Sequence, residues 1–520
     1  MESILEKLNN YANDGYLPMH MPGHKRNTEL FGKSLPFSID VTEIPEFGDL
    51  HHGTDDCIKI AQERAARIFG ADKSFFLING STVGLISAIL ASTRPGQKIL
   101  MARNSHICVY HAIELGKLFP VYVYPDVYSG QIKEEDVRKA LHKDKDIVAI
   151  VIASVTYEGI VSDVRNIAKA AHERGIVLIV DEAHGAHFGF DSYFPENANR
   201  LGADIVVHSL HKTLPSLTQT ALLHCNGDLV DAKRVKESLH RLQSSSPSYV
   251  LMSSIDNCLK ILEERGELFK EYAINLKNIR KRLGEINGNI IEKKHCAPEA
   301  HIGCEADACT KIESISDPSK IVINCMGFGL SGFETAKILH DKYKIQVEMA
   351  TAREIIALTS IGDTSKALQR FAAAIEEINN SYKGRKYSEE KEVFGGEIYR
   401  KNDEGNAPVA RYTAWQVFDE AKKGEIIRLP IMEAIGYICA EYIYAYPPGR
   451  PLIVPGEELT KESMKEIESV FRNIEYESKN YESKRTKRIK EKEIEEKETE
   501  KKETAKKTEE IRMIEVWILE

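Results

Sequence analysis

A lysine and an aspartate follow two apolar segments at places where sheet strands typically end. Lys212 closes the motif Ser209-Leu210-His211-Lys212, after the β-branched run Ile205–Val207. Asp181 comes directly after a second apolar run, Val177–Val180. A lysine amine can form a Schiff base with an aldehyde, and an ionised aspartate can keep a pyridinium nitrogen protonated. The pair therefore predicts a site for pyridoxal phosphate (PLP), attached at Lys212.

Neighbouring side chains support this interpretation, although each has a structural alternative. Ser209 and His211 can both donate to a phosphate beside Lys212, whereas a lone lysine after a strand is usually a surface residue. Asp181 could instead be a helix N-cap. His184 could bond the cofactor's phenolic oxygen or a substrate carboxylate, and a structural loop histidine is an equal alternative.

Two further motifs follow predicted strands. Asn79-Gly80-Ser81-Thr82-Val83-Gly84 opens an apolar helix, so Ser81, Thr82 and free backbone N–H groups predict a phosphate cradle. A simple Ser/Thr helix cap is the alternative for this motif. His106, after the run Lys98–Ala102, could stack on a pyridine ring or be a satisfied loop histidine.

The elements that must position these residues alternate between strand and helix patterns. We expect strands at Ser74–Ile78, Lys98–Ala102, Val121–Tyr124, Ile147–Ala153, Val177–Val180 and Ile205–Val207. Amphipathic helices fit between them, including Cys57–Phe69, for which Thr54 and Asp55 are possible N-caps. Apolar strands alternating with helices predict an α/β fold with a mostly parallel sheet covered on both faces. Ligands of such sheets bind at the carboxyl ends of the strands.

The length of 520 residues predicts three or four folded units. We expect an N-terminal segment (1–50), a large cofactor-binding domain (51–245), a small α+β domain (246–385), a C-terminal domain (386–476) and a charged tail (477–520). The small domain would contain helices within Leu251–Leu283 and strands near Lys320–Ile323 and Ile345–Met349. The tail is rich in Lys and Glu, and we expect it to be a solvated helix or disordered, without function.

Composition excludes several classes of protein. A net charge of -9 and the lack of a basic patch before the tail argue against nucleic acid as a partner. No apolar run approaches the roughly 20 residues of a membrane helix, and Met1–Lys7 does not begin a signal peptide. Nine scattered cysteines indicate reduced thiols, hence the cytoplasm. His295, Cys296, His301, Cys304 and Cys309 are spaced too loosely for a zinc site, so we expect no metal.

Taken together, these motifs resemble those of the Orn/Lys/Arg decarboxylase family, PLP enzymes of fold type I with an aspartate-aminotransferase-like architecture. The resemblance covers about residues 1 to 475. It rests on Met21-Pro22-Gly23-His24-Lys25, Asn79-Gly80-Ser81-Thr82, Asn104-Ser105-His106, Thr156-Tyr157-Glu158-Gly159, Asp181-Glu182-Ala183-His184, Ser209-Leu210-His211-Lys212, Tyr446-Pro447-Pro448-Gly449-Arg450-Pro451-Leu452 and Val454-Pro455-Gly456-Glu457. The chain lacks the long N-terminal extension of the larger inducible members and is similar to the shorter biosynthetic type. His208, where the family leads us to expect glutamine, and the charged tail depart from the pattern.

The resemblance implies Lys212 as the Schiff-base lysine, Asp181 as the pyridinium partner and His106 as the stacking ring. It implies phosphate contacts from Ser81, Thr82, Ser209 and His211, a C-terminal decarboxylase domain, and a homodimer or higher homo-oligomer. The expected reaction is α-decarboxylation of a basic L-amino acid for polyamine biosynthesis, with arginine favoured over lysine or ornithine. Lys212 or His184 would then protonate Cα.

Two alternatives to this reaction remain open. An aminotransferase or acyltransferase of the same fold could use Arg353 to hold a substrate carboxylate. A non-catalytic regulatory homologue could have kept the fold. The acid that binds the substrate's distal charge is also open, the candidates being Glu43, Asp49, Glu158 and Glu457.

Overall fold

The computed structural model describes residues 2–14, 17–53, 56–126, 129–286, 316–382, 385, 410–421, 426–445, 449–464, 467 and 515–519. The chain divides into two compact units. The first contains Met1–Ile279, Lys293–Lys320 and Thr359–Leu368, and the second contains Arg280–Glu292, Ile321–Leu358 and Gln369–Glu520. None of the helices in the described ranges combines the length and apolar character that a bilayer crossing requires.

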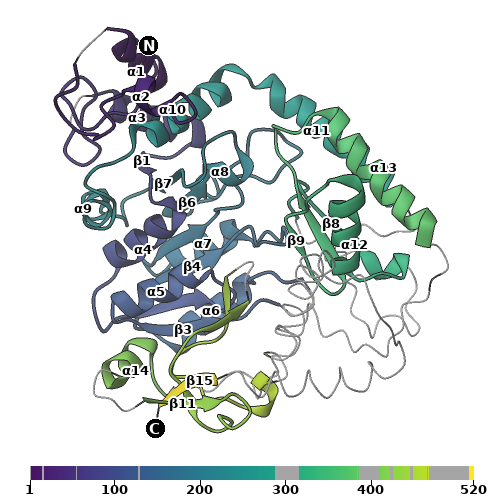
Figure 1. Cartoon of the computed structure of the whole chain (residues 1–520). Coiled ribbons are helices and arrows are strands. Elements are labelled where there is room, and N and C mark those ends of the chain that lie inside the picture. Colours follow the sequence, from purple (N-terminus) through teal and green to yellow (C-terminus); the bar gives the residue numbers. More distant parts are fainter. Residues whose placement is uncertain are drawn as a thin grey trace. The chain divides into compact units, whose positions relative to one another are not determined.

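A seven-stranded sheet is the centre of the first unit (Figure 1). Its order is β1 (Lys73–Leu77), β7 (Ala221–Cys225), β6 (Ile205–Ser209), β5 (Val177–Asp181), β4 (Ile147–Ala153), β2 (Lys98–Ala102) and β3 (Phe119–Val123). The five strands from β6 to β3 are parallel, and β7 runs antiparallel to both of its neighbours. The predicted α/β fold with a mostly parallel sheet is therefore confirmed, whereas β7 was not predicted.

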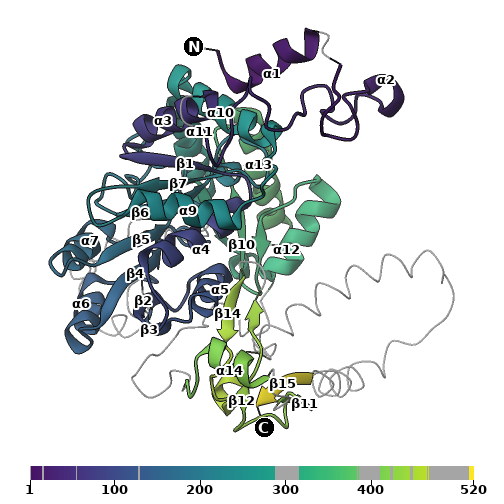
Figure 2. The ribbon, with the colours of Figure 1, turned by 90° about the vertical axis from the view of Figure 1, so that its left-hand side faces the viewer.

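Helices cover both faces of this sheet, α6 and α7 on one side and α4 and α5 on the other (Figure 2). On one face α4 (Gly80–Ser92) contacts β1 and β4 to β7, and α5 (Ile107–Leu115) and α9 (Ala232–Leu242) pack against α4. On the other, α6 (Glu134–Lys143) and α7 (Val164–His172) enclose an apolar core with β2 to β6. Helix α3 (Cys57–Phe69) packs against β1.

Asp56 is the N-cap of α3, because its carboxylate accepts from the N–H groups of Ile58 and Lys59. The expectation that Thr54 or Asp55 caps this helix was therefore wrong in position, and both residues lie outside the described ranges.

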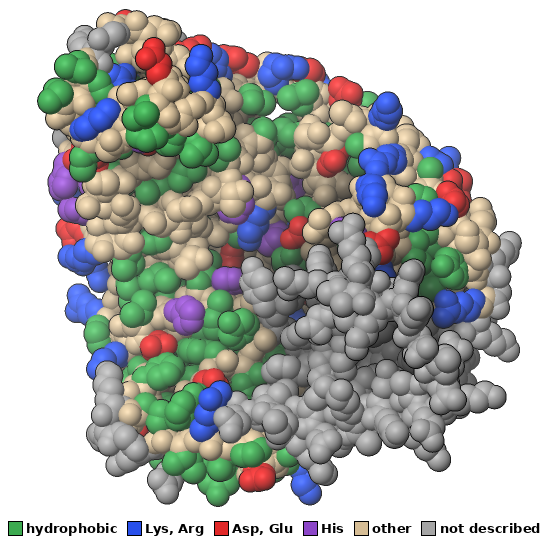
Figure 3. Space-filling view, in the orientation of Figure 1, with side chains coloured by type: hydrophobic (Ala, Val, Ile, Leu, Met, Phe, Trp, Pro, Cys, Tyr) green, Lys and Arg blue, Asp and Glu red, His purple; other side chains and the backbone are tan. Residues whose placement is uncertain are grey.

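The N-terminal part of the first unit is an arm of helices and turns. Helix α1 (Ile4–Asn13) has a capping box between Ser3 and Glu6 and packs against α10 (Tyr249–Glu264). The arm continues through α2 (Thr28–Phe31). Hydrophobic atoms are visible at the upper left of Figure 3. The large apolar side chains exposed along the arm are Leu17, Met19, Met21, Leu30, Phe31 and Leu35.

Helices α11 (Glu267–Gly284) and α13 (Ser365–Tyr382) begin in the first unit and end in the second. The second unit has a three-stranded sheet in the order β8 (Lys320–Asn324), β10 (Glu354–Leu358) and β9 (Met349–Ala350), packed with α12 (Gly332–Ile338). Of the two strands predicted here, β8 has the expected place. The strand predicted near Ile345–Met349 was wrong, because β9 shares only Met349 with it, and β10 was not predicted.

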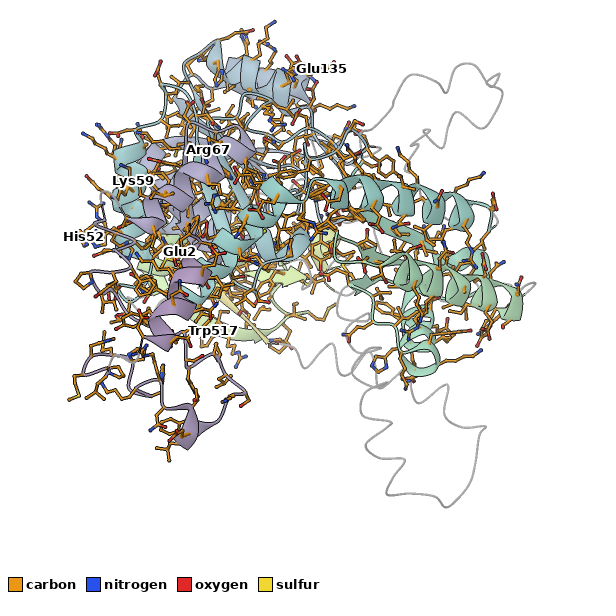
Figure 4. The ribbon with its side chains drawn as sticks, turned by 90° about the horizontal axis from the view of Figure 1, so that it is seen from above. Glu2, His52, Lys59, Arg67, Glu135 and Trp517 are labelled. Carbon is orange, nitrogen blue, oxygen red and sulfur yellow. The ribbon has the colours of Figure 1, made fainter. Side chains whose placement is uncertain are left out.

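The remaining part of the second unit contains α14 (Ala414–Ala421), β11 (Ile426–Pro430), β12 (Ile438–Cys439), β13 (Ile443–Ala445), β14 (Arg450–Ile453) and β15 (Glu515–Leu519). Strand β15 lies between β11 and β12 and pairs with both. Its Val516 and Ile518 are buried, whereas Trp517, labelled in Figure 4, is exposed on the opposite face. The expected solvated or disordered tail was therefore wrong for residues 515–519, because alternating apolar residues give the segment a buried face.

Candidate active site

Lys212 is placed by the end of the central strand β6. The strand ends at Ser209 and continues directly into the single turn α8 (Leu210–Thr213), which carries the lysine. The side chain is half-buried, and its Nζ lies 3.1 Å from Nε2 of His184. The lysine and the histidine predicted from separate motifs are therefore in direct contact.

Asp181 is the last residue of the neighbouring strand β5, and its register partner on β6 is Val207. Its carboxylate is buried, and one oxygen accepts from the N–H of Ala183 at 3.1 Å. A turn follows Asp181, so the alternative of a helix N-cap is wrong. The carboxylate is thus fixed at the carboxyl edge of the sheet, beside the strand that leads to Lys212.

His184 has a neutral ring at ordinary pH. Burial, reinforced by the charges of Lys212 and Lys320, holds the pKa of His184 well below its usual range. Its Nδ1 is buried and has no hydrogen-bond partner among the described residues. The ring of Tyr157 meets it edge-on, with centroids 4.9 Å apart. One ring nitrogen therefore faces Lys212, and the other remains available to a ligand.

His106 is the N-cap of α5. Its Nδ1 accepts from the backbone N–H of Cys108 at 3.2 Å, so the proton of the neutral ring lies on Nε2. Burial lowers the pKa of His106, which the charge of Asp181 opposes and that of Lys212 reinforces. The ring is therefore a satisfied histidine at Nδ1, and its Nε2–H is a donor near Asp181 and Lys212, so stacking on a pyridine ring stays a prediction.

Helix α4 presents an uncapped amino terminus at the same edge. Its N-cap residue Asn79 makes no side-chain cap bond, and Gly80 has a φ of +77°, a value that favours glycine. The Ser209 hydroxyl donates to the Ser81 hydroxyl at 2.8 Å, whereas Thr82 is exposed. Free N–H groups and two converging hydroxyls fit a phosphate, and a simple Ser/Thr cap is not what the structure contains.

Close packing holds α4 against the sheet. A Cβ at Gly84 would come 2.5 Å from Leu77 and 3.2 Å from Val207. Val207 precedes Ser209 by two residues and therefore lies on the same face of β6. The glycine thus brings the amino end of α4 next to Ser209.

His211 is held by the loop after α8. Its Nδ1 donates to the carbonyl of Thr220 at 2.9 Å, and burial and Lys212 lower the pKa of its ring. Nε2 of the neutral ring has no proton, so His211 can donate to a phosphate only in its protonated form.

The residues at this edge fit PLP in chemistry. Lys212 supplies an amine, Asp181 a buried carboxylate, and Ser81 and Ser209 hydroxyls at a helix amino terminus. The unpartnered Nδ1 of His184 offers one further polar contact. An aldehyde, a pyridine nitrogen and a phosphate require this combination of groups.

Sequence reasoning missed a buried charged cluster next to the site. His187 Nε2 lies 3.0 Å from Asp317 Oδ1, and Lys320 Nζ lies 3.0 Å from Asp317 Oδ2. All three side chains are at most 1% exposed. Lys320 also donates to the backbone carbonyl of His184 at 3.5 Å. The available signal was an aspartate and a lysine three residues apart directly before an apolar strand.

A second buried pair, Glu182 and His208, involves the residue that departs from the family pattern. His208 Nε2 lies 2.7 Å from Glu182 Oε2, and both side chains are at most 1% exposed. Burial raises the pKa of Glu182 well above its usual range and lowers that of His208 to about 3. The pair is therefore uncharged overall. It lies on the opposite face of β6 from Ser209, because successive residues of a strand alternate.

The candidates for the distal substrate charge come from different segments of the chain. Asp49 accepts from the N–H groups of His51 and His52, and Glu43 accepts from the hydroxyl of Thr42. Glu158 directly follows Tyr157, whose ring meets His184. Glu457 and Arg353 belong to the second unit.

The predicted absence of a metal site rested on the cluster around Cys304, which lies outside the described residues. Within the described ranges, no three His, Cys, Asp or Glu side chains are arranged to hold a metal ion.

Comparison with known proteins adds three findings. The profile of the Orn/Lys/Arg decarboxylase major domain matches residues 3–367, and that of the Orn/Lys/Arg decarboxylase C-terminal domain matches residues 396–481. An arginine decarboxylase of Bacillus subtilis (strain 168) is 31% identical over 481 residues, 90% of this chain and 92% of that protein. The constitutive lysine decarboxylase of Escherichia coli (strain K12) is 25% identical over 508 residues, 83% of this chain and 70% of that protein.

The fold also matches solved structures. The crystal structure of the Francisella novicida lysine decarboxylase superposes with a TM-score of 0.74 at 20% identity, covering 92% of this chain and 77% of that one.

Proposed function

Because the chain belongs to the Orn/Lys/Arg decarboxylase family, we propose that it removes the α-carboxylate of a basic L-amino acid with PLP as its cofactor. Arginine is the favoured substrate, and lysine and ornithine are the alternatives. The contact between Lys212 Nζ and His184 Nε2, at the sheet edge where Asp181 ends β5, carries the proposal. An amine, an acid and a neutral imidazole at one edge support cofactor attachment and proton transfer.

When bound, PLP supplies an electron-accepting ring that stabilises the charge left on Cα as carbon dioxide departs. The residues around it have distinct tasks. Asp181, whose carboxylate is fixed by the N–H of Ala183, would hold the pyridine nitrogen. Ser81, Ser209 and the amino terminus of α4 bind the phosphate and fix the ring's position.

Proton transfer belongs to Lys212 and His184. Because the His184 ring is kept neutral, its Nε2 can accept a proton from Lys212 Nζ and return it. Either group would then protonate Cα after the carboxylate has left. His106 retains one proton, on Nε2, and can donate it in a hydrogen bond without adding a full positive charge.

The names of the relatives support a basic substrate, since those reported above are arginine and lysine decarboxylases. Glu158 is the favoured partner for the distal cation, because it follows Tyr157 next to His184. Incubation with L-arginine, L-lysine and L-ornithine, each with product identification, tests the reaction. Agmatine, cadaverine or putrescine with carbon dioxide supports decarboxylation, whereas exchange with a keto acid supports an aminotransferase.

Covalent attachment has its own test. Borohydride reduction of the PLP-loaded protein, followed by peptide mass mapping, is expected to place the pyridoxyl group on Lys212. K212A should bind PLP without this modification, and K320A, which removes the buried lysine that contacts the carbonyl of His184, is the matched control that keeps it. Absence of the group from Lys212 in the parent protein would overturn the assignment.

Three wider statements belong to the same proposal. The exposed apolar residues of the N-terminal arm, such as Leu17 and Met19, support a homodimer or higher homo-oligomer in which a second copy covers them. Light scattering coupled to gel filtration tests this, and a monomer would contradict it.

Free cysteines, six of them among the described residues, support a cytoplasmic location, and the expected products support a place in polyamine biosynthesis.

A further inference from the structure

The segment Ser316–Lys320, here called the brace, contacts both loops that carry His184 and its neighbour Tyr157. On the loop after β4, the N–H of Asp317 donates to the carbonyl of Gly159 at 2.8 Å, and Ser316 forms a β-bridge with Ile160. On the loop after β5, Asp317 meets the ring of His187 and Lys320 meets the carbonyl of His184. One short segment therefore holds both loops in the first unit.

The brace is built on a buried charge that is fully hydrogen-bonded. The carboxylate of Asp317 meets His187, Lys320, and the N–H and hydroxyl of Ser319. Burial alone would raise the pKa of Asp317, but Lys320 and His187 hold it below its usual range. A buried ion pair is tolerated only when it is satisfied in this way, and such a pair has one well-defined geometry.

Gly159 shows how closely the lysine is packed. Its φ is +94°, and a Cβ there would come 3.3 Å from Cδ of Lys320. The lysine side chain therefore lies directly against the loop after β4, with its amine directed to Asp317 and to the carbonyl of His184.

The charges of the brace also reach the ring of His184. Four groups act on this ring: Lys212 and Lys320 disfavour its protonation, Asp317 favours it, and His106 disfavours it. Lys320 and Asp317 act in opposite directions on the pKa of His184, so removing one or the other should move this pKa in opposite directions. A general loosening of the structure does not reproduce this difference.

We propose that Lys320 and Asp317 are positioning residues, which fix the loop that carries His184 so that its ring stays against Lys212. Neither residue needs to touch the substrate. Their part in catalysis rests on the proposed function, whereas the effect on the two loops does not.

The test compares K320M with the double variant D317N/K320M. Removal of Lys320 leaves Asp317 to favour protonation of His184, so the acid limb of kcat/KM should move upward by about one pH unit. The pH midpoint of the bound cofactor's absorbance should move with it. In the double variant the shift should be smaller, because the carboxylate that produces it is absent.

A readout without cofactor or substrate completes the design. Amide hydrogen exchange in the cofactor-free protein should accelerate in the peptides that cover 155–161 and 182–188 of K320M. The matched control is D256N, which breaks another buried pair, Arg64–Asp256 at 2.7 Å, far from these loops in sequence. It should lower stability without changing either midpoint or the exchange of the two loops.

The outcomes separate the two proposals. If the parent protein forms no amine from the three amino acids, the proposed function fails, and loop exchange and absorbance still decide on the brace. If K320M decarboxylates with the parent's pH profile and exchanges its loops at the parent's rate, the positioning role is overturned. Equal shifts of the pH midpoints in K320M and in the double variant would show that the charge of Asp317 does not act on His184.

Discussion

Replacing Glu182 by glutamine should change how the stability of the first unit depends on pH. Glu182 and His208 form a pair at 2.7 Å in which both side chains are at most 1% exposed. Besides His208, the carboxylate meets the N–H of Ala198 at 2.9 Å. Burial outweighs this single backbone bond, so the pKa of Glu182 lies well above its usual 4.5 in the folded protein.

The magnitude follows from proton linkage. Above pH 4.5 the unfolded chain releases the Glu182 proton, whereas the folded protein keeps it up to the raised pKa. The stability that Glu182 contributes is therefore fully present below pH 4.5. It is lost as the pH rises from 4.5 to the raised pKa of the folded protein. The advantage of the parent over E182Q should fall by about 1.4 kcal/mol per pH unit.

His208 gives the opposite dependence and serves as the matched comparison. Its pKa of about 3 in the folded protein lies below the usual 6.5, so it stays neutral where the unfolded chain takes up a proton. The advantage of the parent over H208Q should therefore be constant above pH 6.5. It should decline by about 1.4 kcal/mol per unit as pH falls from 6.5 towards 3.

Urea unfolding at pH 5.5, 6.5 and 7.5 measures both differences. Pulsed amide exchange in the peptides of β5 and β6 should follow the transition, because it reports the first unit separately from the second. Comparing each variant with the parent removes the contribution of all other titrating groups. A constant difference between the parent and E182Q over this range would show that Glu182 is ionised when folded, and would refute the reasoning from burial.

Three further predictions concern single side chains. I518A should destabilise the second unit by about 2–5 kcal/mol, whereas W517A, on the exposed face of β15, should cost less than about 1 kcal/mol. Equal decreases of the melting temperature in the two variants would contradict the assignment of Ile518 to the buried face of β15. S209A should weaken PLP binding about tenfold or more in absorbance titrations, since it removes a hydrogen bond to a charged group, and unchanged affinity would argue against the cradle. H106N keeps an acceptor for the N–H of Cys108, so stability should hold while the spectrum of the bound cofactor changes; an unchanged spectrum would argue against a stacked ring.

The sheet was predictable where apolar runs were long and β-branched, as in β4 and β5. Strand β7 was missed because Ala221–Cys225 is short, contains a histidine and lacks β-branched residues. Strand β15 has only five residues after a long Lys- and Glu-rich run, so the composition of the tail outweighed the short apolar run Val516–Leu519.

The site was predictable in its parts but not in its support. Lys212 and Ser81 each follow a strand and Asp181 ends one, and parallel strands bring such positions to one edge. The contact between Lys212 and His184 depends on how two loops fold back, which strand patterns do not encode. Asp317 and Lys320 are more than 100 residues from these motifs in sequence. Their role depends on a tertiary contact that one sequence without relatives does not reveal.

The position of β15 has a consequence for biosynthesis. Strands β11 and β12 leave the ribosome before the strand that joins them, since β12 ends at Cys439 and β15 begins at Glu515. At about 5–20 residues per second, translation of the intervening residues takes roughly 4–15 s. During this time the nascent chain exposes two unpaired strand edges, which attract chaperones or other nascent chains. Faster or slower decoding of that interval should therefore alter the yield of correctly assembled protein.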